Sequence, residues 1–297
     1  MRLNRGALKR QAREDMRRPR PPFWAVTLAY LGMTSGVALA VSLIPTPASG
    51  SGNGDFFLMI LLNLYIAVVD FGFVLWTLWS HRRLDPDMGA LVQSFSVAGR
   101  VIVMEISILV RVLLWSMVLA MILSFAVSPL VMLLLRATGG TGPVVALTVL
   151  AMLAGVEILL YVVSLRYALA PYLLADRPDD GPGAAVRRSV EMMRGWSWEL
   201  FKLDFSFVGW ELLALALSWA VQIACLWYAG FFQALPGIGA EQLVSYYYWA
   251  MNGIVPNALI LLVTIPVKMW LLPYQGVTRA GFYDARLQAQ QRSAPPL

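Results

Sequence analysis

The sequence predicts an all-α membrane protein: a bundle of six transmembrane helices with both termini cytoplasmic and a cytoplasmic amphipathic connector between helices four and five. The first observation behind this prediction is composition. Hydrophobic residues make up 59% of the 297 residues and charged residues 13%, whereas about a quarter of a soluble domain is charged. Mean hydropathy is +0.67. This composition therefore argues against a soluble fold.

The second observation is six apolar runs, each long enough to cross a hydrocarbon core, which takes about 20 helical residues. The strict alternation of barrel strands is absent. The expected spans are about 24–44, 56–80, 101–127, 144–170, 206–230 and 253–275. A membrane domain at 23–275 then lies between a basic cytoplasmic tail at 1–22 and a second cytoplasmic tail at 276–297.

The third observation is the distribution of basic residues. If the spans alternate in direction, 20 of the 23 Lys and Arg residues fall on the side of the N-terminus. By the positive-inside rule this side is the cytoplasm, so we expect a multi-pass protein of a bacterial plasma membrane. The first run is longer than a signal-peptide core, and we expect it to remain as an uncleaved helix.

Several chemistries lack their usual residues. Cys225 is the only cysteine and His81 the only histidine, so a zinc site of His and Cys ligands cannot be built. Nucleotide-binding and hydrolase motifs are absent. We therefore expect no catalytic residue, cofactor or metal. The basic N-terminal tail indicates anionic lipid as partner rather than nucleic acid.

The connector follows the fourth span. Pro171 and the run DRPDDGPG at 176–183 predict a break in the helix. A short helix should follow, with Val186, Val190 and Met193 on one face and Arg187, Glu191 and Arg194 on another, ending at Gly195. Its expected role is to anchor two spans or to dock a partner protein, for which the candidate surface is Arg187, Arg188, Glu191, Arg194, Trp196 and Trp198.

Four motifs carry a resemblance: LRYALAPYLLADRP, RRSVEMMRG, LFKLDFSFVGW and LLPYQGVTRAGFY. In type and order they resemble the bacterial integral-membrane family called domain of unknown function 975. The resemblance implies a multi-helix plasma-membrane protein without an assigned activity. The long outer loop at 231–252, with YYYW at 246–249, departs from the tight turn expected of the family. The matching residues are Tyr167, Tyr172, Asp176, Pro178, Ser189, Met193, Gly195, Phe201, Leu203, Phe207, Gly209, Trp210, Pro273, Tyr274, Ala280, Phe282 and Tyr283.

Ionisable residues within the spans are the candidate polar site, because a charge in mid-membrane costs about 2.5–3.5 kcal/mol and normally faces a partner or water. Counting from the span ends places Arg111 and Glu157 near mid-depth, where they could pair. Lys268 could pair with Asp70 or Glu211. Pro266 is a candidate hinge beside Lys268. The candidate polar site consists of Asp70, Glu105, Arg111, Glu157, Glu211 and Lys268.

The spacing of Gly32 and Gly36 indicates a close packing face, within the chain or between copies in a homo-oligomer. His81, beside Arg82 and Arg83, is interpreted as an interfacial polar residue, with pH sensing as the alternative. Three functions stay open: a transport-related protein that exports or excludes an amphipathic or cationic molecule, a membrane scaffold that docks a cytoplasmic partner, and an intramembrane lipid enzyme.

Overall fold

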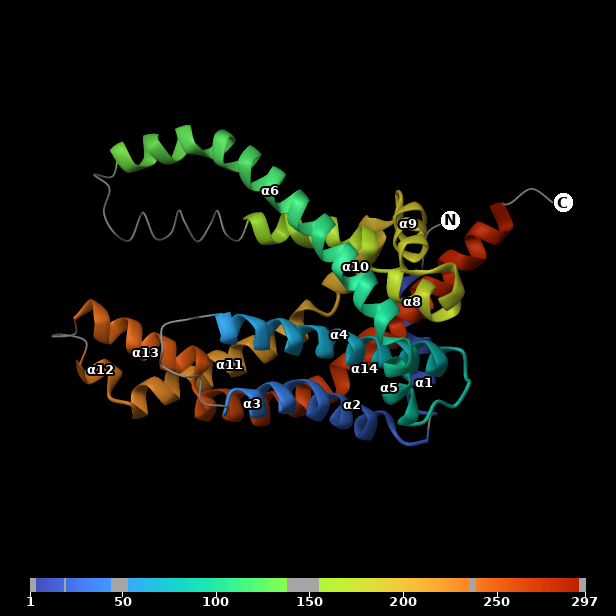
Figure 1. The fold of residues 1–297 in the computed structure, drawn as a ribbon, viewed down its shortest axis with the longest axis horizontal. Helices are drawn as coiled ribbons and strands as arrows, with labels where there is room; N and C mark the ends of the chain where they lie inside the picture. Colours follow the sequence, from blue (N-terminus) through green and yellow to red (C-terminus); the bar gives the residue numbers. More distant parts are fainter. Residues whose placement is uncertain (1–3, 19, 44–52, 138–154, 235–238, 294–297) are drawn as a thin grey trace. The chain divides into compact units, whose positions relative to one another are not determined.

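The computed structural model describes residues 4–18, 20–43, 53–137, 155–234 and 239–293. Every regular element in these ranges is a helix, and none of these residues is in a strand (Figure 1). The prediction of an all-α protein is confirmed. The expected start of the fourth span, at 144–154, lies outside the described residues.

Six helical stretches are long and apolar enough to cross a membrane. They run over Phe23–Val41, Phe56–His81, Gly89–Leu133, Gly155–Asp176, Val208–Tyr228 and Ser245–Arg292. Each overlaps one of the six predicted spans. Hydropathy alone thus located the apolar helices, although two of them are much longer than expected.

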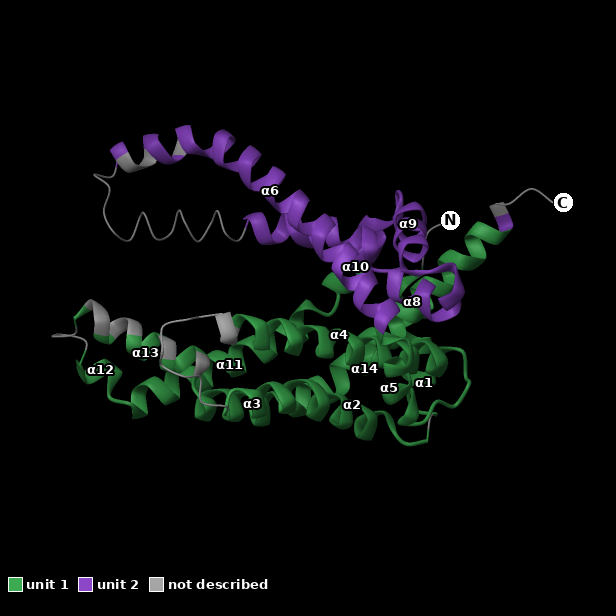
Figure 2. Ribbon diagram, viewed as in Figure 1, with its two compact units in different colours: residues 1–98, 203–291 green, residues 99–202, 292–297 purple. Residues whose placement is uncertain are grey.

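The chain divides into two compact units (Figure 2). Unit 1 comprises Met1–Ala98 and Leu203–Gln291, and unit 2 comprises Gly99–Lys202 and Arg292–Leu297. Unit 1 contains four of the apolar stretches and unit 2 contains most of the other two. Each unit is described separately below.

In unit 1, helices from both ends of the chain pack together. The core contains Met16 directly after α1, Val26 of α2, Trp76 of α4, Leu91 of α5 and residues of α14, all at most 3% exposed. The helices α14 and α4 approach each other closely at Gly276 of α14, where an added β-carbon would lie 2.6 Å from Thr77 Cγ2 of α4. The elements are α1 (Arg5–Asp15), α2 (Phe23–Leu31), the π-helix η1 (Gly32–Gly36), α3 (Val37–Val41), α4 (Asn53–His81), α5 (Gly89–Gln93), the 3-10 helix η2 (Ser94–Val97), α11 (Val208–Tyr228), α12 (Phe231–Ala234), α13 (Ala240–Asn252) and α14 (Ile254–Ser293).

In unit 2, a long helix is followed by a chain of short ones. The hydroxyl of Ser189 joins them, since it donates to the Arg166 carbonyl (2.9 Å) and accepts from the Leu169 amide (3.2 Å). Ser189 is fully buried. The elements are α6 (Ala98–Ala137), a helix over residues 155–164, the 3-10 helix η3 (Leu165–Tyr167), α8 (Ala170–Asp176), the 3-10 helix η4 (Pro178–Asp180), α9 (Pro182–Met193) and α10 (Ser197–Phe205), which passes into unit 1.

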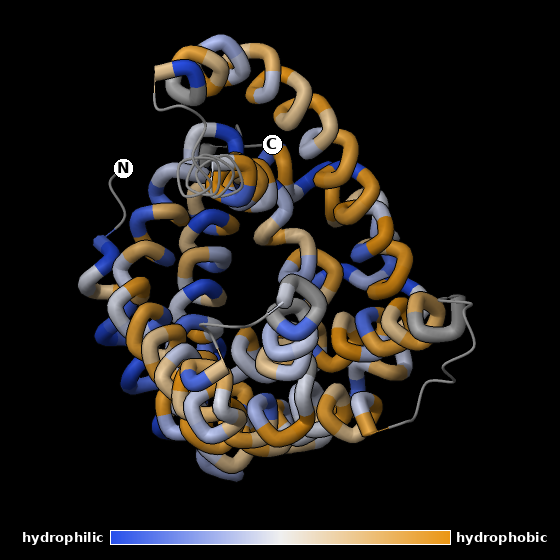
Figure 3. The backbone as a smooth tube through the Cα atoms, turned by 90° about the vertical axis from the view of Figure 1, so that its left-hand side faces the viewer, coloured by the Kyte–Doolittle hydropathy of each residue, from blue (hydrophilic) through white to orange (hydrophobic). Residues whose placement is uncertain are grey.

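Large apolar side chains remain exposed along the spans. Phe125 of α6 is 76% exposed, Trp227 of α11 70% and Leu262 of α14 63%. Hydrophobic residues run along most of the helices, and hydrophilic residues occur in shorter stretches (Figure 3). Exposed large apolar side chains in this number are typical of a surface that binds a partner or lies in a membrane.

The structure corrects three expectations. The expected tail after residue 275 is largely a continuation of α14, with Phe282 and Tyr283 buried, because those residues carry an apolar face that packs in unit 1. The third span continues to Ala137 rather than residue 127. At Gly32, no other part of the described chain lies within 4 Å of the β-carbon position outside the helix itself, so no close packing within the chain forms at this glycine, and Gly32–Gly36 is a π-helical turn.

Candidate functional site

A cavity of about 290 Å³ lies in unit 1 between the first and last apolar helices and is lined by Lys268. One wall carries Ser35, Ala38, Leu39 and Ser42, and the other carries Asn257, Ile260, Leu261 and Lys268. The lining therefore combines one amine, two hydroxyls and one amide with aliphatic side chains. Small-molecule sites have this character, with few polar groups set in apolar walls.

The backbone on both sides of this cavity is irregular. In η1 the amide of Val37 donates to the carbonyl of Gly32, five residues back, which is the π-helical pattern. In α14, Pro266 has no amide hydrogen to donate and disfavours a straight helix. Thr264 Oγ1 contacts two carbonyls of the preceding turn, at 2.7 Å from Ile260 O and 3.3 Å from Leu261 O. π-turns and proline kinks inside spans often occur at binding sites.

The acids expected to pair with Lys268 are hydrogen-bonded elsewhere. Asp70 accepts a hydrogen bond of 2.8 Å from the hydroxyl of Tyr30, and Glu211 accepts one of 2.8 Å from the amide of Gln275. Within the described ranges, no carboxylate lies within ion-pair distance of the Lys268 amine. The charge that faces the cavity is therefore a cation, although acids outnumber bases among the intramembrane candidates.

Arg111 and Glu157, in unit 2, also do not form the expected pair. The Arg166 guanidinium lies 5.8 Å from the ring centre of Trp115, and Leu123 faces Gly155, which fixes the antiparallel register of the two helices. At about 1.5 Å per residue, Arg111 is displaced from Glu157 by several turns. The depth estimate was wrong because α6 is 40 residues long, about twice what a membrane requires.

Two further features concern this pair's surroundings. Arg111 Nη1 is buried without a hydrogen-bond partner among the described residues. Glu105, on the same helix, is half-buried and does have an interaction partner. Glu157 is not among the residues that line the Lys268 cavity. The six candidates therefore do not gather into one site.

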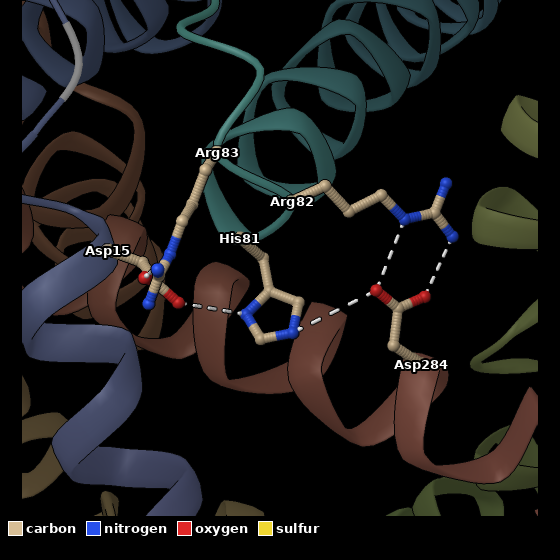
Figure 4. Close-up of polar contacts among 5 residues, drawn as sticks. All are labelled: Asp15, His81, Arg82, Arg83 and Asp284. Carbon is tan, nitrogen blue, oxygen red and sulfur yellow. Dashed lines mark hydrogen bonds and ion pairs between the residues drawn. The ribbon is translucent and has the colours of Figure 1, made fainter. Parts of the chain in front are cut away.

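A second polar group in unit 1, which we call the His81 cluster, consists of Asp15, His81, Arg82, Arg83 and Asp284 (Figure 4). Asp15 is fully buried; its Oδ2 lies 3.2 Å from His81 Nδ1, and its Oδ1 lies 3.3 Å from Arg83 Nε. On the other side of the imidazole, Nε2 lies 3.9 Å from Asp284 Oδ2. Arg82 binds both oxygens of Asp284, at 3.1 and 2.7 Å. The cluster thus joins α1, the end of α4, and α14.

The local chain explains how these groups meet. The helix α4 ends in a Schellman motif, in which Leu84 N donates to Trp79 O and Arg83 N to Ser80 O. Arg83 occupies the left-handed position of this motif, with φ of 59°, where glycine is usual. At Gly281 a β-carbon would lie 3.1 Å from His81 and 3.2 Å from Leu8. This glycine lets α14 approach both α1 and the imidazole.

The basic helix α1 is fixed to unit 1 by further contacts. Lys9 donates to the carbonyl of Ser206 (3.2 Å) and its amine lies 4.1 Å from the ring centre of Phe207. Burial, followed by the charges of Arg13 and Arg5, lowers the pKa of Lys9 below its usual value. Arg13 donates to the hydroxyl of Tyr274 (3.1 Å). The basic tail is therefore helical over Arg5–Asp15, and this helix packs on protein through the face that carries Asp15.

The connector in unit 2 folds as predicted from its periodicity. In α9, Val186 and Met193 are buried and Val190 is half-buried, while Arg187 and Glu191 of the helix and Arg194 directly after it are exposed. The helix ends before Gly195, which has φ of +78°. Arg188 binds Asp180 at 2.9 Å, so it is engaged within the connector. Trp198 is 64% exposed and stacks on Phe201 at 4.9 Å, whereas Trp196 is half-buried.

Several site residues were missed from sequence. Asp15 and Asp284 were not singled out, although Asp15 follows Leu8 and Ala12 on the apolar face of α1, and an acid on an apolar face is a recognisable signal. Ser35, Ser42 and Asn257 carry no signal beyond polarity inside apolar runs. In the parts of the chain that the structure describes, no three His, Cys, Asp or Glu side chains are grouped to hold a metal ion.

A family model described as protein of unknown function DUF975 matches residues 1–290. No curated protein and no solved structure matches the chain. The matched residues include those of α1, the His81 cluster, the Lys268 cavity and the connector. Because the match covers nearly the whole sequence, the chain belongs to the DUF975 family.

Proposed function

We propose that this protein is transport-related: it moves or excludes an amphipathic molecule with an acidic group, from a bacterial plasma membrane in which both termini are cytoplasmic. The observation that carries the proposal is the Lys268 cavity. A charged amine without a carboxylate partner costs free energy in an apolar region. An anionic ligand that binds beside the Lys268 amine would offset this cost.

The chemistry of the lining selects the kind of molecule. Lys268 supplies a positive charge, while Ser35, Ser42 and Asn257 supply hydrogen bonds. The aliphatic walls of Ala38, Leu39, Ile260 and Leu261 suit a hydrocarbon portion. The amphipathic molecule expected from the sequence fits this lining. A cationic molecule would be repelled by the Lys268 amine that lines this cavity.

The orientation rests on charge. The His81 cluster and α1 belong to the side that holds 20 of the 23 basic residues, which the positive-inside rule assigns to the cytoplasm. The cavity is lined by Ser42 and Asn257, at the other ends of the first and last spans. In this orientation the cavity lies in the outer half of the membrane, where an exported amphiphile would leave.

The test is complementation of a strain that lacks the gene, challenged with a panel of anionic and cationic membrane-active compounds. We expect the strain to be sensitive to anionic amphiphiles and to be rescued by the wild type and by Lys268→Arg, which keeps the charge. Lys268→Gln should fail to rescue at equal membrane levels. Lys202→Gln makes the same change on the connector, where Lys202 contacts Glu199, and should rescue. Rescue by Lys268→Gln would overturn the proposal.

A second candidate function, a scaffold that docks a cytoplasmic protein, is favoured by the exposed face of α9. Arg187, Glu191 and Arg194 point away from the buried face of this helix. Charge reversal at Arg187, which has no structural role in the connector, should then remove a specific protein from a membrane pull-down. An unchanged set of bound proteins would exclude docking on this face.

A further inference from the structure

We propose that unit 2 holds a binding site for a phosphate group, formed by Arg166 and Arg194 at the elbow between α9 and α10. A hollow of about 370 Å³ lies there, lined by Arg166, Val190, Met193, Arg194, Gly195 and Ser197. This volume is within the range of ligand sites, about 300–1,000 Å³. The site is independent of the Lys268 cavity, which belongs to unit 1.

The two arginines lining this hollow are free of carboxylates, unlike their neighbours. In the same unit, Asp179 is paired with Arg100 at 3.5 Å, and Asp180 is paired with Arg188 at 2.9 Å and Arg177 at 3.9 Å. These two acids thus engage three arginines, Arg100 of α6 and Arg177 and Arg188 of the connector. Among the described residues, neither Arg166 nor Arg194 has a carboxylate within ion-pair distance.

The backbone holds the two guanidinium groups on one hollow. Ser189 ties the start of the connector to α9 through its hydrogen bonds to Arg166 O and Leu169 N. Gly195, at φ of +78°, turns the chain directly after Arg194, and nothing lies within 4 Å of its β-carbon position. That wall of the hollow is therefore open. Two exposed guanidinium groups around an open hollow form a receptor for a planar or tetrahedral oxyanion.

The surroundings indicate phosphate as that oxyanion. The Arg166 guanidinium lies over the ring of Trp115, and Trp196 and Trp198 follow Arg194 directly. Tryptophans gather at the headgroup level of membranes, where lipid phosphates are the abundant anions and basic pockets between helices bind them. Val190 and Met193 provide an apolar wall for the glycerol of such a lipid. A soluble phosphate ester would present the same group to the same arginines.

Native mass spectrometry of the full-length protein in detergent tests the site. The probes are phosphatidylglycerol, phosphatidylcholine and inorganic phosphate. We expect bound phosphatidylglycerol to exceed phosphatidylcholine, and Arg166→Gln and Arg194→Gln each to weaken it by about tenfold, the effect of losing one charge-assisted hydrogen bond. Arg187→Gln removes the same charge from the exposed face of α9, outside the hollow, and should bind like the wild type.

The lipid and soluble sources are separated by competition. If millimolar inorganic phosphate displaces the lipid, or binds where the lipid does not, the site takes soluble phosphate; if it does neither, the site is a lipid site. If the Gln variants do not fold, Arg166→Lys takes their place in the test. This variant keeps the positive charge and should retain part of the phosphatidylglycerol binding. Unchanged phosphatidylglycerol binding in both Gln variants, together with no phosphate binding by the wild type, would overturn the proposal. Equal loss in Arg187→Gln would do so as well.

Discussion

The two ends of unit 1 differ in what covers their apolar residues. Around the His81 cluster, Trp76, Phe207, Phe282 and Tyr283 are at most 1% exposed. At the other ends of the same helices, large apolar side chains are exposed. Phe56 is 67% exposed and Met59 is 64% exposed, and Trp227 and Leu262 are exposed to a similar degree. One end is closed by protein, and the other leaves its apolar side chains exposed. We infer that the first end supplies stability and the second end carries the Lys268 cavity.

The sharpest test of this difference compares two leucines of α14. Leu271 belongs to the core and is 2% exposed, whereas Leu262 is 63% exposed. Leu271→Ala should destabilise the protein by about 2–5 kcal/mol, because it leaves a cavity in packed surroundings. Leu262→Ala should cost much less, since lipid or detergent fills the space. Thermal unfolding in one detergent measures both, and equal losses would remove the distinction between the two ends.

The next largest effect is expected in the His81 cluster. Asp15→Ala leaves His81 and Arg83 without their shared carboxylate and should cost about 3 kcal/mol, the lower end of the range for breaking a buried pair, because Arg83 is half exposed. Glu14→Ala is the control, since Glu14 is exposed on the neighbouring position of α1. If both variants unfold at the wild-type temperature, the cluster does not stabilise this end.

A smaller effect is expected where α14 meets α4. Gly276→Ala would bring a β-carbon to 2.6 Å from Thr77 Cγ2, and such overpacking typically costs about 1–3 kcal/mol. Gly209→Ala places the same methyl group on α11, where nothing lies within 4 Å. This control should be neutral, or more stable by up to about 1 kcal/mol, because alanine favours a helix over glycine. A stable Gly276→Ala protein would mean that this contact can relax.

Much of the fold could be predicted from sequence because its main signals are local. Apolar run length gave six helices of membrane-spanning length, and a period of 3.6 residues gave the buried and exposed faces of α9. Gly195 marked the end of that helix for a purely local reason, its left-handed backbone. These properties depend on residues a few positions apart, which a single sequence displays directly.

The sites could not be predicted to the same extent because they depend on register between distant segments. Asp15, His81 and Asp284 are separated by 66 and 203 positions in the chain, and no local pattern brings them together. Depth counted from span ends also failed for Arg111, because α6 extends well beyond a membrane thickness. Lys268 remains a candidate site residue, but it lines a cavity and does not pair with Asp70 or Glu211 as expected.

The π-helical turn at Gly32–Gly36 has a geometric consequence for the first span. One extra residue in a turn shifts the rotational phase of everything after it by roughly 100°, the angle between successive residues of an α-helix. Val26 and Leu31 pack in the protein on one phase, and Ala38, Leu39 and Ser42 line the cavity on another. A single helical wheel drawn over the whole span superimposes these two stripes. The first span therefore consists of two α-helical segments, joined by the five-residue π-helical turn, whose contact faces point in different directions around the helix axis.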